Sequence, residues 1–198
     1  MSLKKKRFTT REITTIAIMA ALSVVMVTFA KFPFPPAPFL EYDAADIPIF
    51  ITTFAFGPAV GFILTIVVSV IQGLTVSVAT MPWGVLMHII ATGSFVLVAG
   101  NIYKRNKTRK QAGIALLAGV AVWTGAMMVC NLLITPIYMN VPLEQVVGML
   151  VPVLLPFNLM KAGINAGITF LLYKPLSRLI HSKKGNTQAK VAEKPEES

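Results

Sequence analysis

Long apolar runs separated by short polar breaks dominate this chain. No Asp, Glu, Lys or Arg lies between residues 46 and 104, and only Glu144 and Lys161 carry charge between residues 110 and 174. Tracts of this length are long enough to cross a lipid bilayer several times. Gly, Pro and charged breaks divide them into six predicted helices, at residues 13–30, 44–56, 59–79, 85–103, 111–135 and 146–173. The pattern therefore predicts an all-α integral membrane protein, a bundle of six transmembrane helices.

The composition agrees with this prediction and divides the chain into three regions. Apolar residues make up 55% and charged residues 13% of the chain, and the mean hydropathy is +0.71, far above that of a typical soluble domain. We expect a basic N-terminal segment at residues 1–12, a membrane domain at 13–173 and a charged, disordered tail at 174–198. The one cysteine, Cys130, lies in an apolar run and is expected to be a small buried residue.

The net charge of +10 comes from clusters of basic residues beside the apolar runs, which favours a role in topology over nucleic acid binding. If six helices alternate in direction, these clusters all fall on one side of the membrane. The positive-inside rule makes that side cytoplasmic, with both termini on it. The proline-rich segment 31–48, the turn at Trp83 and the loop with Glu144 then lie outside. The clusters outside the tail are Lys4, Lys5, Lys6, Arg7 and Arg11, and Lys104, Arg105, Lys107, Arg109 and Lys110.

A polar stripe marks the last predicted helix. Asn158, Lys161 and Asn165 are spaced i, i+3 and i+7, so they share one helix face, while Leu159, Ile164 and Ile168 lie away from it. A lysine at this depth is costly unless it is paired or meets water, so it indicates a functional site. Because the predicted spans contain no acidic residue near it, an internal salt bridge for Lys161 is not expected. Asn165 lies a turn deeper and is expected to serve helix packing.

Asn131, on the fifth predicted helix, lies at a depth similar to that of Asn158. We expect these two amides and Lys161 to converge in an outward-facing pocket beneath segment 31–48. Amides both donate and accept hydrogen bonds and lysine only donates, so the set suits a neutral heterocycle with imide-like edges or an anionic head group. Segment 31–48 cannot be regular helix because of its prolines, and its acids make it either a solvated loop or a lid.

Several kinds of chemistry lack their sequence signatures. There is no G-x-x-x-x-G-K-[ST] phosphate loop, so the chain cannot hydrolyse ATP itself. We find no candidate for a buried carboxylate, a Ser/His/Asp set, paired catalytic acids or a zinc pattern, and His88 alone is weak evidence for a metal. We expect no metal, no cofactor and no enzymatic activity, and instead a small membrane-embedded binder that takes its energy from other subunits.

The first predicted helix carries a strip of small residues, Ala17, Ala20 and Ala21, with the spacing Ala17-x-x-x-Ala21. Small residues at this spacing let another helix approach closely. The strip suits either packing within the bundle or docking to a partner subunit.

Four motifs carry a resemblance to a known family. They are Phe-Leu-Glu-Tyr-Asp-Ala-Ala-Asp-Ile-Pro at 39–48, Phe-Gly-Pro-Ala-Val-Gly at 56–61, Gly-Val-Leu-Met-His-Ile-Ile-Ala-Thr at 84–92 and Pro-Phe-Asn-Leu-Met-Lys at 156–161. Over about residues 10–180 the chain resembles the riboflavin-specific S components of energy-coupling-factor (ECF) vitamin transporters. These are membrane subunits that bind the vitamin and present it to a coupling subunit and two ATPase subunits.

The resemblance implies a site and partners. The polar edge of the riboflavin isoalloxazine would meet Asn131, Asn158 and Lys161, and its ribityl chain would meet Leu40, Tyr42 and Asp43. Phe39 and Trp83 would supply apolar contact, and the alanine strip would dock to the coupling subunit in the cell membrane. The chain departs from the family pattern at Glu41, where a basic residue is common, and at Ala44, where a proline is common. Binding of another vitamin, a membrane-embedded enzyme and a structural subunit without ligand are the alternatives.

Overall fold

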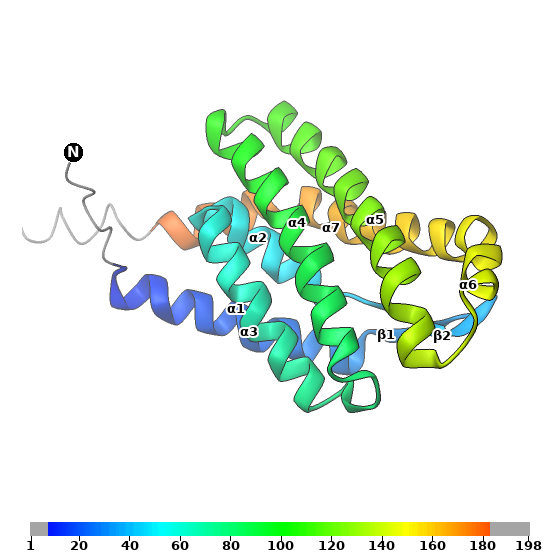
Figure 1. Cartoon of the computed structure of the whole chain (residues 1–198). Coiled ribbons are helices and arrows are strands. Elements are labelled where there is room, and N and C mark those ends of the chain that lie inside the picture. Colours follow the sequence, from blue (N-terminus) through cyan, green and yellow to red (C-terminus); the bar gives the residue numbers. More distant parts are fainter. Residues whose placement is uncertain (1–7, 183–198) are drawn as a thin grey trace, which may run out of the picture.

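A computed structural model describes residues 8–182, so the basic residues at 4–7 and the part of the expected tail at 183–198 lie outside the described residues. Helices dominate and one hairpin interrupts them (Figure 1). In chain order the elements are α1 (Thr10–Phe29), β1 (Lys31–Phe34), β2 (Ala37–Asp43), α2 (Asp46–Phe56), α3 (Pro58–Leu74), a 3₁₀ turn (Val78–Thr80), α4 (Trp83–Arg105), α5 (Arg109–Met139), α6 (Leu143–Met149), a π-helical segment (Leu150–Leu154) and α7 (Leu155–Ser182).

Four helical stretches are long and apolar enough to cross a membrane: α1, α4, α5 and the continuous stretch from α6 into α7. The shorter apolar helices are α2, with 11 residues, and α3, with 17. At 1.5 Å per residue, α2 covers only about 16 Å, roughly half of the hydrocarbon thickness. Residues 46–55 of α2 are all buried, so this short helix is enclosed by the rest of the bundle.

Three helix ends differ clearly from the sequence prediction, the largest difference being α7, which runs to Ser182 rather than ending near residue 173. Helix α3 ends at Leu74 rather than near residue 79, because the carbonyl of Gln72 accepts the N–H groups of Thr75, Val76 and Ser77 and closes the helix. Helix α5 does not end at Pro136 but runs on to Met139. A proline in the last turn removes a single hydrogen bond, which the helix tolerates.

The proline-rich segment is a β-hairpin, not an irregular loop. Strand β1 pairs antiparallel with β2, Lys31 opposite Asp43 and Phe32 opposite Tyr42, with a register shift after Pro33. Prolines are tolerated because each strand of a two-stranded ribbon has a free edge. The predicted interruption of the last helix is confirmed: the chain is π-helical over Leu150–Leu154, which contains Pro152, and Pro156 lies in the first turn of α7 directly after it.

Aromatic rings form the centre of the bundle. Phe50 of α2 stacks on Phe95 of α4 with ring centroids 3.7 Å apart, and Phe54 stacks on Tyr103 at 4.3 Å. Both pairs are buried. Cys130 is buried, as expected.

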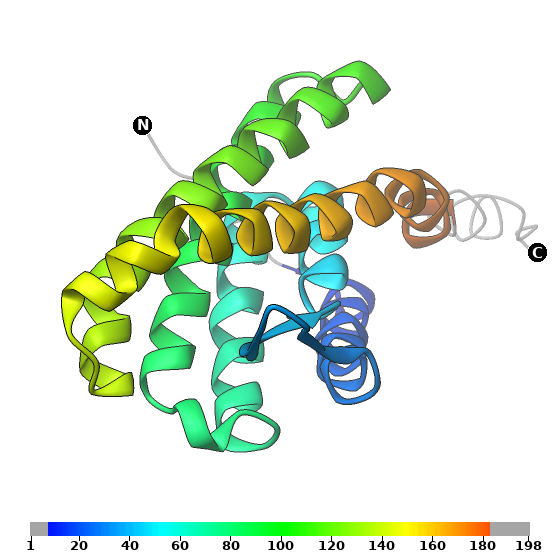
Figure 2. The ribbon, with the colours of Figure 1, turned by 90° about the vertical axis from the view of Figure 1, so that its right-hand side faces the viewer.

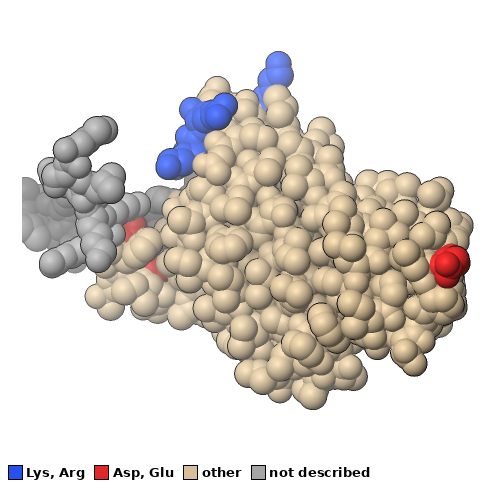
Figure 3. Space-filling view, viewed as in Figure 1, with Lys and Arg blue, Asp and Glu red and all other residues tan. Residues whose placement is uncertain are grey.

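Charge is distributed unequally between the two ends of the molecule. Exposed Lys and Arg side chains gather where α4 joins α5, at residues 104–110, and an exposed acidic side chain lies at the opposite end over α6 (Figure 3). The hairpin lies at this second end, and Figure 2 looks onto it and shows the hairpin crossing the bundle beneath α7. The hairpin is thus placed far from the basic end, as the sequence pattern predicts.

Candidate functional site

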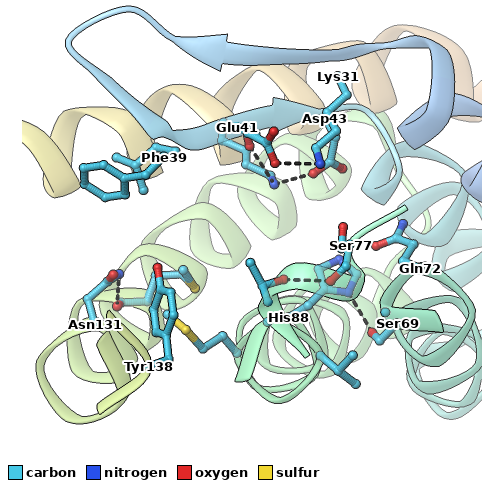
Figure 4. A pocket seen from close by; sticks show the side chains of 18 of the residues that line it. Lys31, Phe39, Glu41, Asp43, Ser69, Gln72, Ser77, His88, Asn131 and Tyr138 are labelled. Atoms are coloured by element: carbon cyan, nitrogen blue, oxygen red, sulfur yellow. Dashed lines mark hydrogen bonds and ion pairs between the residues drawn. The ribbon is translucent and has the colours of Figure 1, made fainter. Parts of the chain in front are cut away.

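A cavity of about 190 Å³ lies between the hairpin and the helices below it. In Figure 4 the labelled hairpin side chains lie across the cavity from Asn131, Tyr138 and His88. Besides the hairpin, α3, α4, α5 and α7 supply its walls. The polar residues that line it are Lys31, Glu41, Asp43, Ser69, Gln72, Ser77, Thr80, His88, Asn131, Tyr138 and Lys161.

Lys161 forms the salt bridge that the sequence analysis did not expect. Its Nζ lies 2.6 Å from Oδ2 of Asp43, and both side chains are less than 15% exposed. The Nζ also lies 3.5 Å from the carbonyl oxygen of Glu41. The prediction was wrong because it counted the acids of segment 31–48 as exposed, whereas the hairpin folds back onto α7. Pairing offsets part of the several kcal/mol that burial of each charge costs.

Asn165 joins the hairpin to the bundle, rather than serving helix packing alone. Its Oδ1 accepts the Tyr42 hydroxyl at 2.9 Å, and its Nδ2 donates to the Asp43 carbonyl at 3.1 Å. Burial, and next the negative charge of Asp43, raise the pKa of the Tyr42 phenol above its ordinary value. The predicted face is otherwise as expected, with Leu159 and Ile164 exposed, although Ile168 packs against the core.

A buried carboxylate is present after all, at the start of α2. Asp46 is 1% exposed, and its Oδ1 accepts hydrogen bonds from His88 Nε2 at 3.0 Å and Thr92 Oγ1 at 2.9 Å. The other nitrogen of His88, Nδ1, lies 2.7 Å from Ser69 Oγ. A Ser/His/Asp set therefore exists, contrary to the sequence analysis, because α2, α3 and α4 bring together residues that are far apart in the chain.

This set does not have the features of a hydrolase triad. The Ser69 hydroxyl is 1% exposed and lies 2.6 Å from the Thr65 carbonyl, to which it donates. With its proton directed to the Thr65 carbonyl, the hydroxyl is not poised to pass that proton to Nδ1 of His88. A nucleophilic serine would instead be accessible and would donate its proton to the histidine.

The two predicted asparagines have different surroundings. Asn131 lines the cavity; its Nδ2 donates to Met127 O at 2.7 Å and its Oδ1 accepts from Thr135 at 3.0 Å, which leaves one N–H and one lone pair for a ligand. Asn158 is 1% exposed and does not line the cavity. Its Nδ2 donates to Leu154 O, while its Oδ1 has no partner in the described part of the chain.

Five of the eight predicted ligand contacts line the cavity: Phe39, Leu40, Asp43, Asn131 and Lys161. Tyr42 instead bonds to Asn165. Trp83 packs against a small apolar cluster with Met87, Cys130 and Ile134. The tryptophan that lines the cavity is Trp123, whose Nε1 donates to Thr92.

Gln72 and His88 are among the polar residues of the cavity that sequence reasoning did not assign to the site. Gln72 is 8% exposed, and its Nε2 has no partner within the described residues. The signal was available, since both are strongly polar side chains within the otherwise apolar tract between residues 46 and 104. Within residues 8–182, no group of three or more His, Cys, Asp or Glu is positioned to hold a metal ion.

Comparison with known proteins identifies the family. The model of one family, described as the ECF transporter substrate-specific component, matches residues 11–173. The chain belongs to this family. A solved structure described as the S component of a bacterial ECF transporter superposes with a TM-score of 0.73 at 29% identity, covering 86% of this chain and 98% of that one.

Curated relatives of this S component carry transporter names. The riboflavin transporter RibU of Staphylococcus aureus (strain TCH60) is 30% identical over 177 residues, which cover 86% of this chain and 92% of the relative. The riboflavin transporter FmnP of Bacillus subtilis (strain 168) is 28% identical over 171 residues, which cover 82% and 89%. The match of the family model, residues 11–173, includes the hairpin and most of α7.

Proposed function

We propose that this chain is the riboflavin-binding S component of an ECF vitamin uptake transporter and that the cavity beneath the hairpin is its binding site. The observation that carries the proposal is the set of available polar atoms at this end of the bundle. Asn131 and Lys161 face the cavity, and Gln72 Nε2 and Asn158 Oδ1 are buried without a partner among the described residues. An unpaired buried polar atom costs about 1–3 kcal/mol, which a ligand hydrogen bond would recover.

Riboflavin matches these atoms chemically. One edge of its tricyclic ring alternates carbonyl, N–H and carbonyl, so it needs two donors and one acceptor. Lysine and amide N–H groups supply donors, and Asn131 Oδ1 has a free lone pair at the cavity wall. Asn158 Oδ1 would become a further acceptor once the cavity widens toward it. Phe39 and Trp123 line the cavity and offer ring faces for stacking, while Leu40 and Asp43 on the hairpin lie where a hydroxylated chain would bind.

Binding must widen the cavity. At about 190 Å³ it is smaller than the roughly 300–1,000 Å³ of ordinary small-molecule sites. The hairpin is the wall that is free to move, because a few polar bonds attach it to α7. Glu41, which departs from the family pattern, lines the cavity with its carboxylate already paired to Lys31 at 2.6 Å, whereas Ala44 is buried and is not part of the cavity wall.

We further propose that all six long or apolar helical units cross the membrane, with both termini and the basic end cytoplasmic and the hairpin outside. The partners would be a coupling subunit and two ATPase subunits in the cell membrane, and the chain itself would neither catalyse a reaction nor hold a cofactor. Ala17 and Ala21 are exposed on α1, which suits docking, whereas Ala20 packs against the core.

The test is a riboflavin titration of the full chain in detergent, followed by quenching of flavin fluorescence. We expect saturable binding that Lys161→Ala and Asn158→Ala each weaken by about thirtyfold or more. Lys107→Ala, a change of an exposed residue at the opposite end, serves as the matched control. Gln72→Leu should weaken binding by about tenfold without lowering the stability of the free protein, because it removes an unpaired buried donor.

Absence of quenching would refute the assignment of riboflavin as the ligand. Quenching in the Lys161 and Asn158 variants equal to that of the wild type would refute the assignment of the binding site. Competition by thiamine or biotin would indicate another vitamin. Chromatography of the flavin after incubation distinguishes an enzyme, since a transporter subunit returns riboflavin unchanged.

A further inference from the structure

A second hollow lies away from the hairpin, between α5 and α7. It is a groove of about 310 Å³ whose lining includes Gly113, Leu117 and Val120 of α5 and Gly163, Gly167 and Phe170 of α7. No charged side chain lines it. Both helices belong to stretches long and apolar enough to span a membrane, so a groove along a membrane-spanning pair of this kind would lie at the depth of the hydrocarbon region.

The glycines of this groove do not serve close packing within the bundle. A Cβ added to Gly163 or Gly167 would meet nothing within 4 Å. By contrast, a Cβ at Gly119, which faces the core, would lie 2.7 Å from the Phe95 ring. Glycines spaced Gly163-x-x-x-Gly167 usually allow something to approach the helix backbone. Here the approaching group is not part of the described chain.

Cationic side chains stand at one end of the groove. The Arg109 guanidinium lies 5.4 Å from the ring centroid of Phe170, a groove residue. Lys174 follows Gly163 by eleven residues, about three helical turns, so it continues the groove face of α7. Lys174 is exposed, and neither cation pairs with a carboxylate within residues 8–182.

We propose that this groove binds an anionic phospholipid, with an acyl chain along the glycines and the phosphate between Arg109 and Lys174. The apolar groove suits the acyl chain of such a lipid, and the cationic end suits its anionic phosphate head group. A partner helix fits less well, because membrane helices carry Lys and Arg at the cytoplasmic end. A partner aligned with the groove would then bring cations against Arg109 and Lys174.

The test is native mass spectrometry of the full chain in detergent, titrated with phosphatidylglycerol or with phosphatidylcholine of the same acyl chains. We expect preferential binding of phosphatidylglycerol. Arg109→Gln and Lys174→Gln should each reduce that binding by about fivefold and leave phosphatidylcholine unchanged. Gly163→Leu with Gly167→Leu fills the groove and should reduce binding of both lipids. Inorganic phosphate at the same concentration should not compete, since it lacks the acyl chain.

Two matched controls complete the design. Lys107→Gln removes an exposed cation of the same basic end, and Gly125→Leu adds the same side chain to another exposed glycine of α5 that has nothing within 4 Å of its Cβ position. Both should bind phosphatidylglycerol like the wild type. Equal binding of the two lipids, or equal losses in the control variants, would overturn the proposal. The charge variants decide the matter even if the leucine variants fail to fold.

Discussion

The cavity beneath the hairpin and the groove between α5 and α7 are hollows of opposite construction. Polar groups of the hairpin and of α2, α4 and α7 bond to one another around the cavity, for example Lys161 with Asp43 and His88 with Asp46. The groove exists because its glycines have no side chains to fill it, and charged side chains stand only at one of its ends. The difference teaches that the shape of the cavity depends on each of these paired side chains. The shape of the groove depends only on the side chains that its glycines lack.

The largest effect should follow from Asp46→Ala. Asp46 accepts hydrogen bonds from His88 and Thr92 beneath the cavity, and its removal leaves both groups without their acceptor. We expect the free energy of unfolding to fall by about 2–5 kcal/mol, since each unpaired buried group costs about 1–3 kcal/mol. Thermal unfolding of the purified protein in detergent measures this. Asp46→Asn keeps an acceptor and should lose less, and an Asp46→Ala variant that unfolds with the wild type would contradict the stabilising role of these hydrogen bonds.

A pair of glycine substitutions compares the core with the groove directly. Gly119→Ala places a methyl group 2.7 Å from Phe95, and this ring cannot retreat because it stacks on Phe50 at 3.7 Å. We expect a loss of about 1–3 kcal/mol. Gly167→Ala meets open space and should be neutral or stabilising by up to about 1 kcal/mol. The same unfolding assay applies, and equal losses in the two variants would show that the groove is packed.

The smallest effect concerns the attachment of the hairpin. Tyr42→Phe removes the hydrogen bond to Asn165 and should cost about 0.5–1.5 kcal/mol. The folded protein raises the pKa of Tyr42 above its value of about 10 in the unfolded chain. The hydrogen bond therefore contributes fully to stability below that unfolded-state pKa, and its contribution is lost as the pH rises through the pKa of the folded state. Proteolysis of the hairpin should therefore increase above that pH in the wild type. The phenylalanine variant should be cleaved faster at neutral pH and show no such step.

The membrane character of the fold could be predicted because hydropathy over twenty residues is a strong local signal. Helix ends were less predictable. Helix α3 ends where the Gln72 carbonyl accepts hydrogen bonds from three N–H groups. The residue types in this segment do not predict that arrangement. Helix α5 passes Pro136 because a proline near a helix end costs little there.

The candidate site could be predicted only in part, since its residues meet across long stretches of chain. The Asn158, Lys161 and Asn165 face follows from helical periodicity alone. The partner of Lys161 lies 118 positions earlier in the sequence, and the hairpin that delivers it has no strong strand pattern among its prolines. Likewise Asp46 and His88 are 42 positions apart. From sequence alone, Asp46 was assigned to an exposed segment and His88 was treated as a lone histidine, so their contact was not predicted.

The hairpin is fastened at both of its bases. Only Ala30 separates α1 from β1, and only the buried residues Ala44 and Ala45 separate β2 from α2. A ribbon held at both bases moves least there and most at its tip. The tip follows Phe34, whose ring lies 5.3 Å from that of Phe157 on α7. Lifting the hairpin from its tip would therefore first separate these two rings, whereas the Lys161 and Asp43 contact stays near the fixed base.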